Sequence, residues 1–157
     1  VMDEVLAFEP VRVLDLYSGC GNLSLPLALV GVPITLLEKA RSAVGDARET
    51  AKRMGLLAEA HEADAGQFRA GDHFFDLALL DPPRAGAPGV VAELLITSPK
   101  AIVYVSCNPR TLARDIRPAL DRGYEITRLV VLDMFPQTDH IEVLCVLRRA
   151  DLAELLR

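Results

Sequence analysis

Short apolar runs alternate with amphipathic stretches along almost the whole of this 157-residue chain. Runs rich in Val, Leu and Ile between turn residues predict strands, and apolar residues spaced three to four apart predict helices. The predicted strands are 12–17, 33–38, 58–62, 75–80, 102–106, 125–133 and 142–148. The predicted helices are 23–30, 41–54, 90–97, 110–122 and 152–156, and residues 1–9 have the pattern of a helix end.

This order of elements predicts an α/β fold, because strands alternating with helices over short connections are typical of a parallel sheet covered on both faces. The last two strands are expected to pair antiparallel, since the loop between them, 134–141, has no helical period. The prediction is a doubly wound, Rossmann-like sheet of seven strands, mainly parallel, with the last strand antiparallel at its end. Without repeats or linkers, residues 1–157 are expected to form one domain.

Composition and charge narrow the possible functions. No apolar run is long enough to cross a bilayer. The net charge of −5, from 17 Lys+Arg against 22 Asp+Glu, is unsuited to a protein that binds nucleic acid by itself. Cys20, Cys107 and Cys145 lack the spacing of a disulfide framework or a zinc site. We therefore expect a cytoplasmic protein with no metal and no membrane association.

A glycine-containing loop, Asp-Leu-Tyr-Ser-Gly-Cys-Gly-Asn at 15–22, lies between the first predicted strand and helix. Gly19 and Gly21 allow a sharp turn and leave space for a ligand against the backbone. A dinucleotide fingerprint needs a third glycine at position 24, where this chain has Ser24. The loop therefore favours S-adenosylmethionine, with an NAD-type site as the alternative.

Two acidic residues extend this predicted site. Glu38 ends the second strand, where it can bond ribose hydroxyls, and Asp64 follows the third strand, where it can receive the adenine amino group. Either residue alone could equally cap a helix or face water. Because both lie at the ends of consecutive strands beside the glycine loop, together they predict a nucleoside site.

The sequence Ser-Cys-Asn-Pro at 106–109 follows a buried strand. Cys107 thus lies at the rim where open α/β sheets bind ligands, beside a helix N-terminus that favours a thiolate. It is a candidate nucleophile, although many such cysteines are inert packing. Cys145 lies mid-strand and is expected in the core, and Cys20 is expected to pack beside the cofactor.

Two further loops carry candidate chemistry. In Asp-Pro-Pro-Arg at 81–84, the prolines hold Asp81 near a strand end. Arg84 replaces the aromatic residue found there in exocyclic-amine methyltransferases, which argues against that reaction; it could contact a phosphate or Asp81, or face solvent. Glu142 begins the last strand, where desolvation would suit a general base, although an ordinary strand-end role is the alternative. His140 is a second candidate nearby.

Four motifs occur in order: Tyr-Ser-Gly-Cys-Gly-Asn at 17–22, Asp-Pro-Pro-Arg-Ala-Gly at 81–86, Ser-Cys-Asn-Pro at 106–109, and Phe-Pro-Gln-Thr-Asp-His-Ile-Glu at 135–142. Together they closely resemble the RNA 5-methyluridine (uracil-C5) methyltransferase family. The resemblance runs from about Val11 to Leu147. It implies a class I methyltransferase sheet, S-adenosyl-L-methionine as methyl donor, and rRNA or tRNA as substrate.

The resemblance also implies roles for single residues. Cys107 falls on the family's nucleophile and Glu142 on its proton-abstracting base. The donor-binding positions of the family are matched by Tyr17, Asn22, Glu38 and Asp81.

The reaction explains these residue types. Attack of the Cys107 thiolate on uracil C6 makes C5 nucleophilic enough to take a methyl group, and Glu142 then removes the C5 proton. The base must leave its stack to reach such a pocket, where Asp81 could hold the donor and also bond the uracil.

Two other functions remain open. A cytosine-C5 methyltransferase uses the same thiol addition, but its nucleophile usually follows proline after the fourth strand, whereas Cys107 follows the fifth. A non-catalytic donor-binding or RNA-partner domain would keep the fold without turnover.

The chain also departs from the family pattern. The N-terminal RNA-binding barrel, the central domain, an upstream donor-binding segment and the iron–sulfur cysteines are not in this sequence. We expect the chain to be the C-terminal catalytic part of a longer architecture that needs an additional RNA-binding domain. The block 134–142 favours rRNA over tRNA as substrate.

Overall fold

The computed structural model describes residues 1–71, 74–133, 137 and 141–150. The strands are β1 Val13–Leu16, β2 Ile34–Glu38, β3 Ala58–Glu62, β4 Leu77–Leu80, β5 Ala101–Ser106, β6 Tyr124–Leu132 and β7 Glu142–Arg149. The helices are α1 Met2–Leu6, α2 Leu25–Leu29, α3 Arg41–Met54, α4 Val90–Leu94 and α5 Pro109–Leu120, with a 3-10 turn η1 at Ala65–Gln67. None of the described helices is long and apolar enough to span a bilayer.

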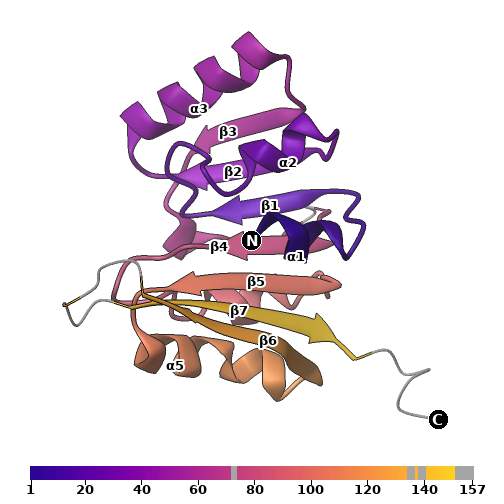
Figure 1. The fold of residues 1–157 in the computed structure, drawn as a ribbon, viewed down its shortest axis with the longest axis vertical. Coiled ribbons are helices and arrows are strands. Elements are labelled where there is room, and N and C mark those ends of the chain that lie inside the picture. Colours follow the sequence, from indigo (N-terminus) through magenta and orange to yellow (C-terminus); the bar gives the residue numbers. More distant parts are fainter. Residues whose placement is uncertain (72–73, 134–136, 138–140, 151–157) are drawn as a thin grey trace.

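The seven strands form one sheet in the order β3-β2-β1-β4-β5-β7-β6 (Figure 1). Neighbours from β3 to β5 are parallel, and β7 is antiparallel to both β5 and β6. The predicted α/β sheet with its last strand antiparallel is therefore confirmed. The reversed strand is not at the end of the sheet, however, because β7 lies between β5 and β6.

Burial explains why β7 takes the inner position. Its residues from Val143 to Leu147 are all buried, so they need neighbours on both sides and cover on both faces. Strand β6 is exposed along most of its length and has a register irregularity between Ile126 and Arg128. Irregular, solvent-facing strands are typical of sheet edges.

The two faces of the sheet carry separate cores, because successive strand residues point to opposite sides. On one face, α1, α2 and α3 pack against strand residues such as Val13 and Leu36. On the other face, α4 and α5 pack against Leu16, Leu80 and Tyr104. The sheet is thus covered on both faces, as the alternation predicts.

The second face is incompletely covered at one end. The connection from β3 to β4 contains only η1 where a doubly wound fold usually has a helix. This turn was not predicted; it forms because the Asp64 side chain accepts a hydrogen bond from Gly66 N–H. The predicted helix 152–156 lies outside the described residues.

Candidate active site at the carboxyl edge of the sheet

The carboxyl ends of β1, β2, β4 and β5 lie along one edge of the sheet, because these strands are parallel (Figure 1). Strand β1 pairs with β2 on one side and β4 on the other, so the strand order reverses there. Open α/β sheets bind ligands in the crevice outside such a reversal. The predicted glycine loop follows β1 at this point.

The backbone of the glycine loop adopts positive φ angles that favour glycine. Gly19 and Gly21 have φ angles of 55° and 87°. A Cβ on Gly21 would lie 2.6 Å from a Leu25 side-chain carbon and 2.9 Å from one of Leu36, closer than real contacts allow. Because Leu25 N–H donates to the Gly21 carbonyl at 2.9 Å, the loop passes directly into α2.

Glu38 joins this loop to the next helix. One carboxylate oxygen accepts from Gly19 N–H at 3.1 Å and the other accepts from Ala40 N–H at 2.7 Å, at the start of α3. Glu38 thus bonds the N-cap residue Ala40 rather than an N–H inside α3, which has no side-chain cap. This bond is compatible with ligand binding, since the same carboxylate also lines a hollow.

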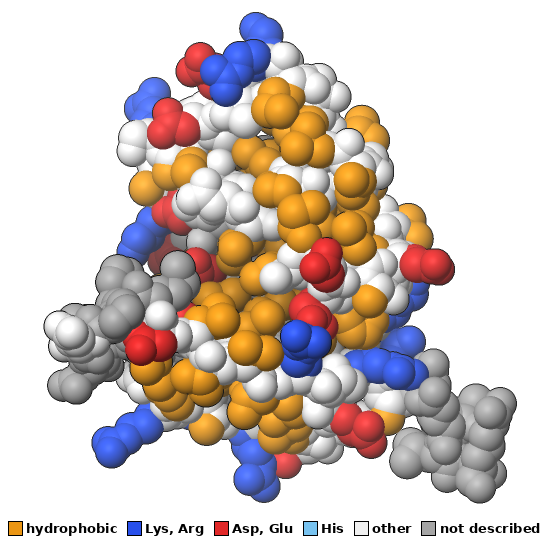
Figure 2. Space-filling view, in the orientation of Figure 1, with side chains coloured by type: hydrophobic (Ala, Val, Ile, Leu, Met, Phe, Trp, Pro, Cys, Tyr) orange, Lys and Arg blue, Asp and Glu red, His pale blue; other side chains and the backbone are white. Residues whose placement is uncertain are grey.

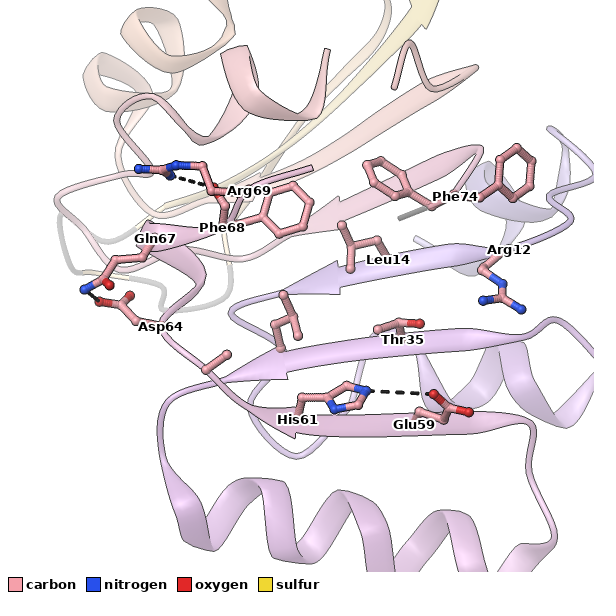
Figure 3. Close-up of a pocket in the computed structure, with 13 residues that line it drawn as sticks. Arg12, Leu14, Thr35, Glu59, His61, Asp64, Gln67, Phe68, Arg69 and Phe74 are labelled. Carbon is pink, nitrogen blue, oxygen red and sulfur yellow. Dashed lines mark hydrogen bonds and ion pairs between the residues drawn. The ribbon is translucent and has the colours of Figure 1, made fainter. Parts of the chain in front are cut away.

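Asp64, which follows β3, likewise both accepts hydrogen bonds from the protein and lines a hollow. Its carboxylate accepts from Gly66 N–H at 2.9 Å and from the Gln67 amide at 3.2 Å, and Figure 3 shows the Asp64 and Gln67 side chains facing each other. Each oxygen has a second lone pair, so these bonds leave acceptor capacity for a ligand.

A hollow of about 170 Å³ gathers four of the predicted donor-binding residues. It is lined by Tyr17, Glu38, Lys39, Asp64, Ala65, Asp81 and Pro83. Asn22 is not among them: it lies in a depression between α2 and α3, where it accepts a weak hydrogen bond from Cys20 Sγ at 3.4 Å. The structure thus brings together residues from four strand ends and places Asn22 apart from them.

A larger hollow of about 750 Å³ lies on the incompletely covered sheet face (Figure 3). Leu14, Thr35 and His61 of adjacent strands form part of its floor, and Phe74 and Phe75 form part of its wall. It meets the smaller hollow at Asp64 but contains neither Cys107 nor Glu142. This larger hollow is therefore separate from the predicted chemistry.

The pairing of β5 with β7 places the predicted nucleophile and base. Ser106, the last residue of β5, lies opposite Val143 of β7. The ladder ends at this pair, and Cys107 and Glu142 are the next residues beyond it on the two segments. Both residues are only partly exposed. His140 lies outside the described residues.

Asp81 is the third predicted catalytic residue at this edge. Its backbone N–H donates to the Leu16 carbonyl at 3.4 Å, one step beyond the β1–β4 ladder. Burial raises the pKa of Asp81, and the negative charge of Glu142 raises it further. The carboxylate of Glu142, at the start of β7, is thus close enough to repel that of Asp81 at the end of β4.

The loop after Asp81 is fastened to α5, which begins two residues after Cys107. The Arg84 carbonyl accepts from the Asn108 amide at 3.3 Å and from the Thr111 hydroxyl at 3.4 Å. The Ala85 carbonyl accepts from Arg114 at 2.8 Å. These bonds set the position of the Asp81 loop relative to Cys107.

A buried carboxylate completes this attachment. Asp115 is 4% exposed and accepts from Ala87 N–H at 2.6 Å, from the Tyr104 hydroxyl at 2.7 Å and from Arg114 Nε at 2.8 Å. Asp115 was not among the predicted site residues. The available signal was an aspartate within the apolar stripe of α5, whose other members are Leu112, Ile116 and Ala119.

A second buried carboxylate, Asp15, lies beneath the glycine loop and is 1% exposed. Neither of its oxygens, nor the hydroxyls of Ser18 and Ser24, has a hydrogen-bond partner of good geometry in the described part of the chain. Burial raises the pKa of Asp15 to about 7; nearby Ser24 opposes the rise, and the charges of Asp81 and Glu38 add to it. This site therefore favours a positively charged ligand or a proton.

Comparison with solved structures places the fold. The chain superposes on the tRNA (uracil-54, C5)-methyltransferase of Pyrococcus abyssi in complex with S-adenosyl-L-homocysteine, with a TM-score of 0.78 and 36% identity, over 94% of this chain and 37% of that one. The magnesium protoporphyrin IX methyltransferase of Synechocystis with bound SAM gives a TM-score of 0.73 at 16% identity, over 95% and 76% of the two chains. The fold is that of class I S-adenosylmethionine-dependent methyltransferases.

Sequence comparison identifies the family. The tRNA (uracil-5-)-methyltransferase family model matches residues 65–150. The 23S rRNA (uracil(1939)-C(5))-methyltransferases RlmD of Klebsiella pneumoniae subsp. pneumoniae and Salmonella typhi are 46% and 45% identical over 143 residues, which are 88% of this chain and 33% of each relative. The chain belongs to the tRNA (uracil-5-)-methyltransferase family, and it spans about a third of the length of these relatives.

We predict that Asp15 makes stability depend on pH in a definite direction. Because the pKa of Asp15 is about 7 in the folded protein against 3.8 ordinarily, the folded state holds a proton that the unfolded chain loses in this window. The free energy of unfolding should therefore fall as pH rises from 4 to 7. In Asp15→Asn this contribution should vanish, giving on the order of 3 kcal/mol more stability at pH 8. Urea unfolding across pH measures it, with exposed Asp46→Asn as control.

We predict that Asp115→Ala destabilises the fold by about 3–5 kcal/mol, because the buried Ala87 N–H and Tyr104 hydroxyl, and the exposed Arg114, lose their acceptor. Tyr104→Phe removes one hydrogen bond to a charged group and should cost about 1.5–3 kcal/mol. The control is Asp121→Ala on the same helix, whose exposed pair with Arg117 should contribute less than about 1 kcal/mol. Urea unfolding compares the three, and equal losses in the two aspartate variants would contradict the buried attachment.

Proposed function

We propose that this chain catalyses S-adenosyl-L-methionine-dependent methylation of uracil C5 in RNA, with rRNA as the favoured substrate. The observation that supports the proposal is the β5–β7 ladder, which ends at the pair Ser106–Val143, the neighbours in sequence of Cys107 and Glu142. Family membership supports it too, since the matched range 65–150 includes both residues.

The carboxyl edge suits the methyl donor. The hollow lined by Tyr17, Glu38, Asp64 and Asp81 offers carboxylates for ribose hydroxyls and for the cationic groups of the donor. The buried Asp15 carboxyl, whose oxygens have no hydrogen-bond partner in the described part of the chain, lies close to the glycine loop. We also assign donor contacts to Gly19, Gly21 and Asn22, following the family motif. When bound, the donor supplies an electrophilic methyl group on a sulfonium, which becomes a neutral thioether once the methyl is lost.

The residues of this chain then perform addition and elimination. The Cys107 thiolate forms a bond to uracil C6, and the C5–C6 π electrons move onto C5 and the adjacent carbonyl. After C5 forms its bond to the methyl group, the Glu142 carboxylate removes the C5 proton. The C5–H electron pair restores the C5–C6 double bond, and the C6–S bond breaks to return the thiolate. Asp81 orients the donor and the uracil.

RNA is the proposed partner, and rRNA is favoured because the relatives named RlmD act on 23S rRNA. The chain has a net charge of −5, which gives it little general attraction for phosphates. We infer that an additional RNA-binding domain, within the two thirds of the relatives that this chain does not span, supplies most of the affinity.

We predict that RNA containing 5-fluorouridine, incubated with the protein and S-adenosyl-L-methionine, forms a covalent protein–RNA adduct. Fluorine at C5 cannot be removed as a proton, so the reaction stops before the thiolate leaves. The adduct should disappear in Cys107→Ala and persist in Cys145→Ala, where a buried strand cysteine is changed. Denaturing gel electrophoresis measures the adduct.

The same assay tests the base with ordinary uridine RNA. Glu142→Gln should accumulate a methylated adduct, because addition and methyl transfer proceed while proton removal fails. Normal release of 5-methyluridine by this variant would remove Glu142 from the mechanism. No adduct with wild-type protein at any concentration would favour a non-catalytic donor-binding domain.

We predict that Glu38→Ala weakens S-adenosyl-L-methionine binding at least ten-fold, since hydrogen bonds to charged groups contribute about 1.5–3 kcal/mol. Calorimetry measures the dissociation constant, and Glu49→Ala on the exposed face of α3 is the matched control. Unchanged affinity in a folded Glu38→Ala protein would contradict the ribose role.

A further inference from the structure

The outer face of α5 carries a line of arginines in an otherwise acidic chain. Arg110, Arg114 and Arg117 are all exposed and follow one another at helical spacings of four and three residues. Such spacings place side chains on one side of a helix. Arg122 follows just after the helix ends. This arginine face contrasts with the excess of acidic residues in the whole chain.

Two acidic residues pair with arginines of this face. Asp115 is buried, accepts from Tyr104 and Ala87, and also pairs with Arg114 at 2.8 Å, so the charge of Arg114 is compensated and Arg114 is left out of the contacts inferred below. Asp121 forms an exposed pair with Arg117 at 2.9 Å. Exposed pairs of this kind contribute little and exchange readily with other partners.

The arginine face begins at the candidate active site. Helix α5 starts at Pro109, two residues after Cys107, and Asn108 caps it by accepting from Arg110 N–H at 3.1 Å. The exposed Arg84 is held beside this first turn, because its carbonyl accepts from Asn108 and Thr111. From Arg110 to Arg117 the helix rises about 10 Å. Positively charged side chains therefore extend from the neighbourhood of Cys107 along the exposed side of α5.

We infer that Arg84, Arg110 and Arg117 form the contact surface for the RNA phosphates next to the reacting uridine. This inference rests on the proposed function, which it deepens by naming where the strand lies. Arginine forms bidentate bonds with phosphate, and the N-terminal end of α5 adds a positive dipole at the same place. The surface lies at the opposite end of the molecule from α3 (Figure 1). Figure 2 shows basic side chains projecting from the end where α5 lies.

The experiment measures the salt dependence of binding to a single-stranded, uridine-containing RNA oligonucleotide. Each phosphate contact on a single strand contributes about 0.7 to the slope of log K against log salt. The double variant Arg110→Gln/Arg117→Gln should therefore lower the slope by about 1.4. The matched control is Lys52→Gln/Arg53→Gln at the exposed end of α3, which removes the same charge and should leave the slope unchanged.

The inference would be overturned if wild-type protein bound no RNA in low salt. It would also be overturned if the salt slope were unchanged in the α5 double variant, or if both double variants lost the same amount of slope. Binding to anionic phosphatidylserine vesicles with no binding to RNA would assign the surface to membranes instead. The 5-fluorouridine adduct separates this inference from the proposed function. If wild type forms the adduct but the α5 double variant keeps the wild-type slope, only the phosphate surface is overturned. If the double variant lowers the slope but wild type forms no adduct, only the proposed chemistry is overturned.

Discussion

The antiparallel pairing of β7 with β5 is the constraint on which the candidate site depends. A one-residue slip of this register would send Glu142 to the other face of the sheet. The register is strongly specified because the residues from Val143 to Leu147 are buried on both faces. Hydrophobic packing in the middle of β7 therefore controls the position of Glu142, the first residue of the strand.

The loops around this edge are held by the carboxylates of the buried Asp115 and the partly exposed Glu38 as well as by apolar contacts. Asp115 attaches the Asp81 loop to α5, and Glu38 attaches the glycine loop to α3. Both carboxylates accept backbone N–H groups that the loops cannot pair internally. Such bonds leave the loops rigid, which benefits a site where two substrates must meet with little freedom.

Charge is distributed unevenly between the two proposed ligands. The donor side gathers Asp15, Glu38, Asp64 and Asp81, which suit a cation, whereas α5 presents arginines that suit a polyanion. The clustering of carboxylates has a cost. The pKa of Asp15 is raised by burial and by the charges of Asp81 and Glu38, and the pKa of Asp81 is raised by burial and by the charge of Glu142. Natural sites often retain such unfavourable electrostatics where a ligand of opposite charge relieves them.

The sequence by itself determined the strand and helix order, the antiparallel last strand, and the motifs that name the family, because periodicity and turn residues are local properties. It could not reveal that β7 inserts between β5 and β6, that η1 replaces a helix, or that Asp15 and Asp115 are buried. Those features depend on which surfaces pack together after the chain folds, and burial alone distinguishes Asp115 from the exposed Asp121 six residues later. The position of Cys107 and Glu142 just beyond the last β5–β7 pair is likewise tertiary, since only strand pairing joins residues so far apart in the chain.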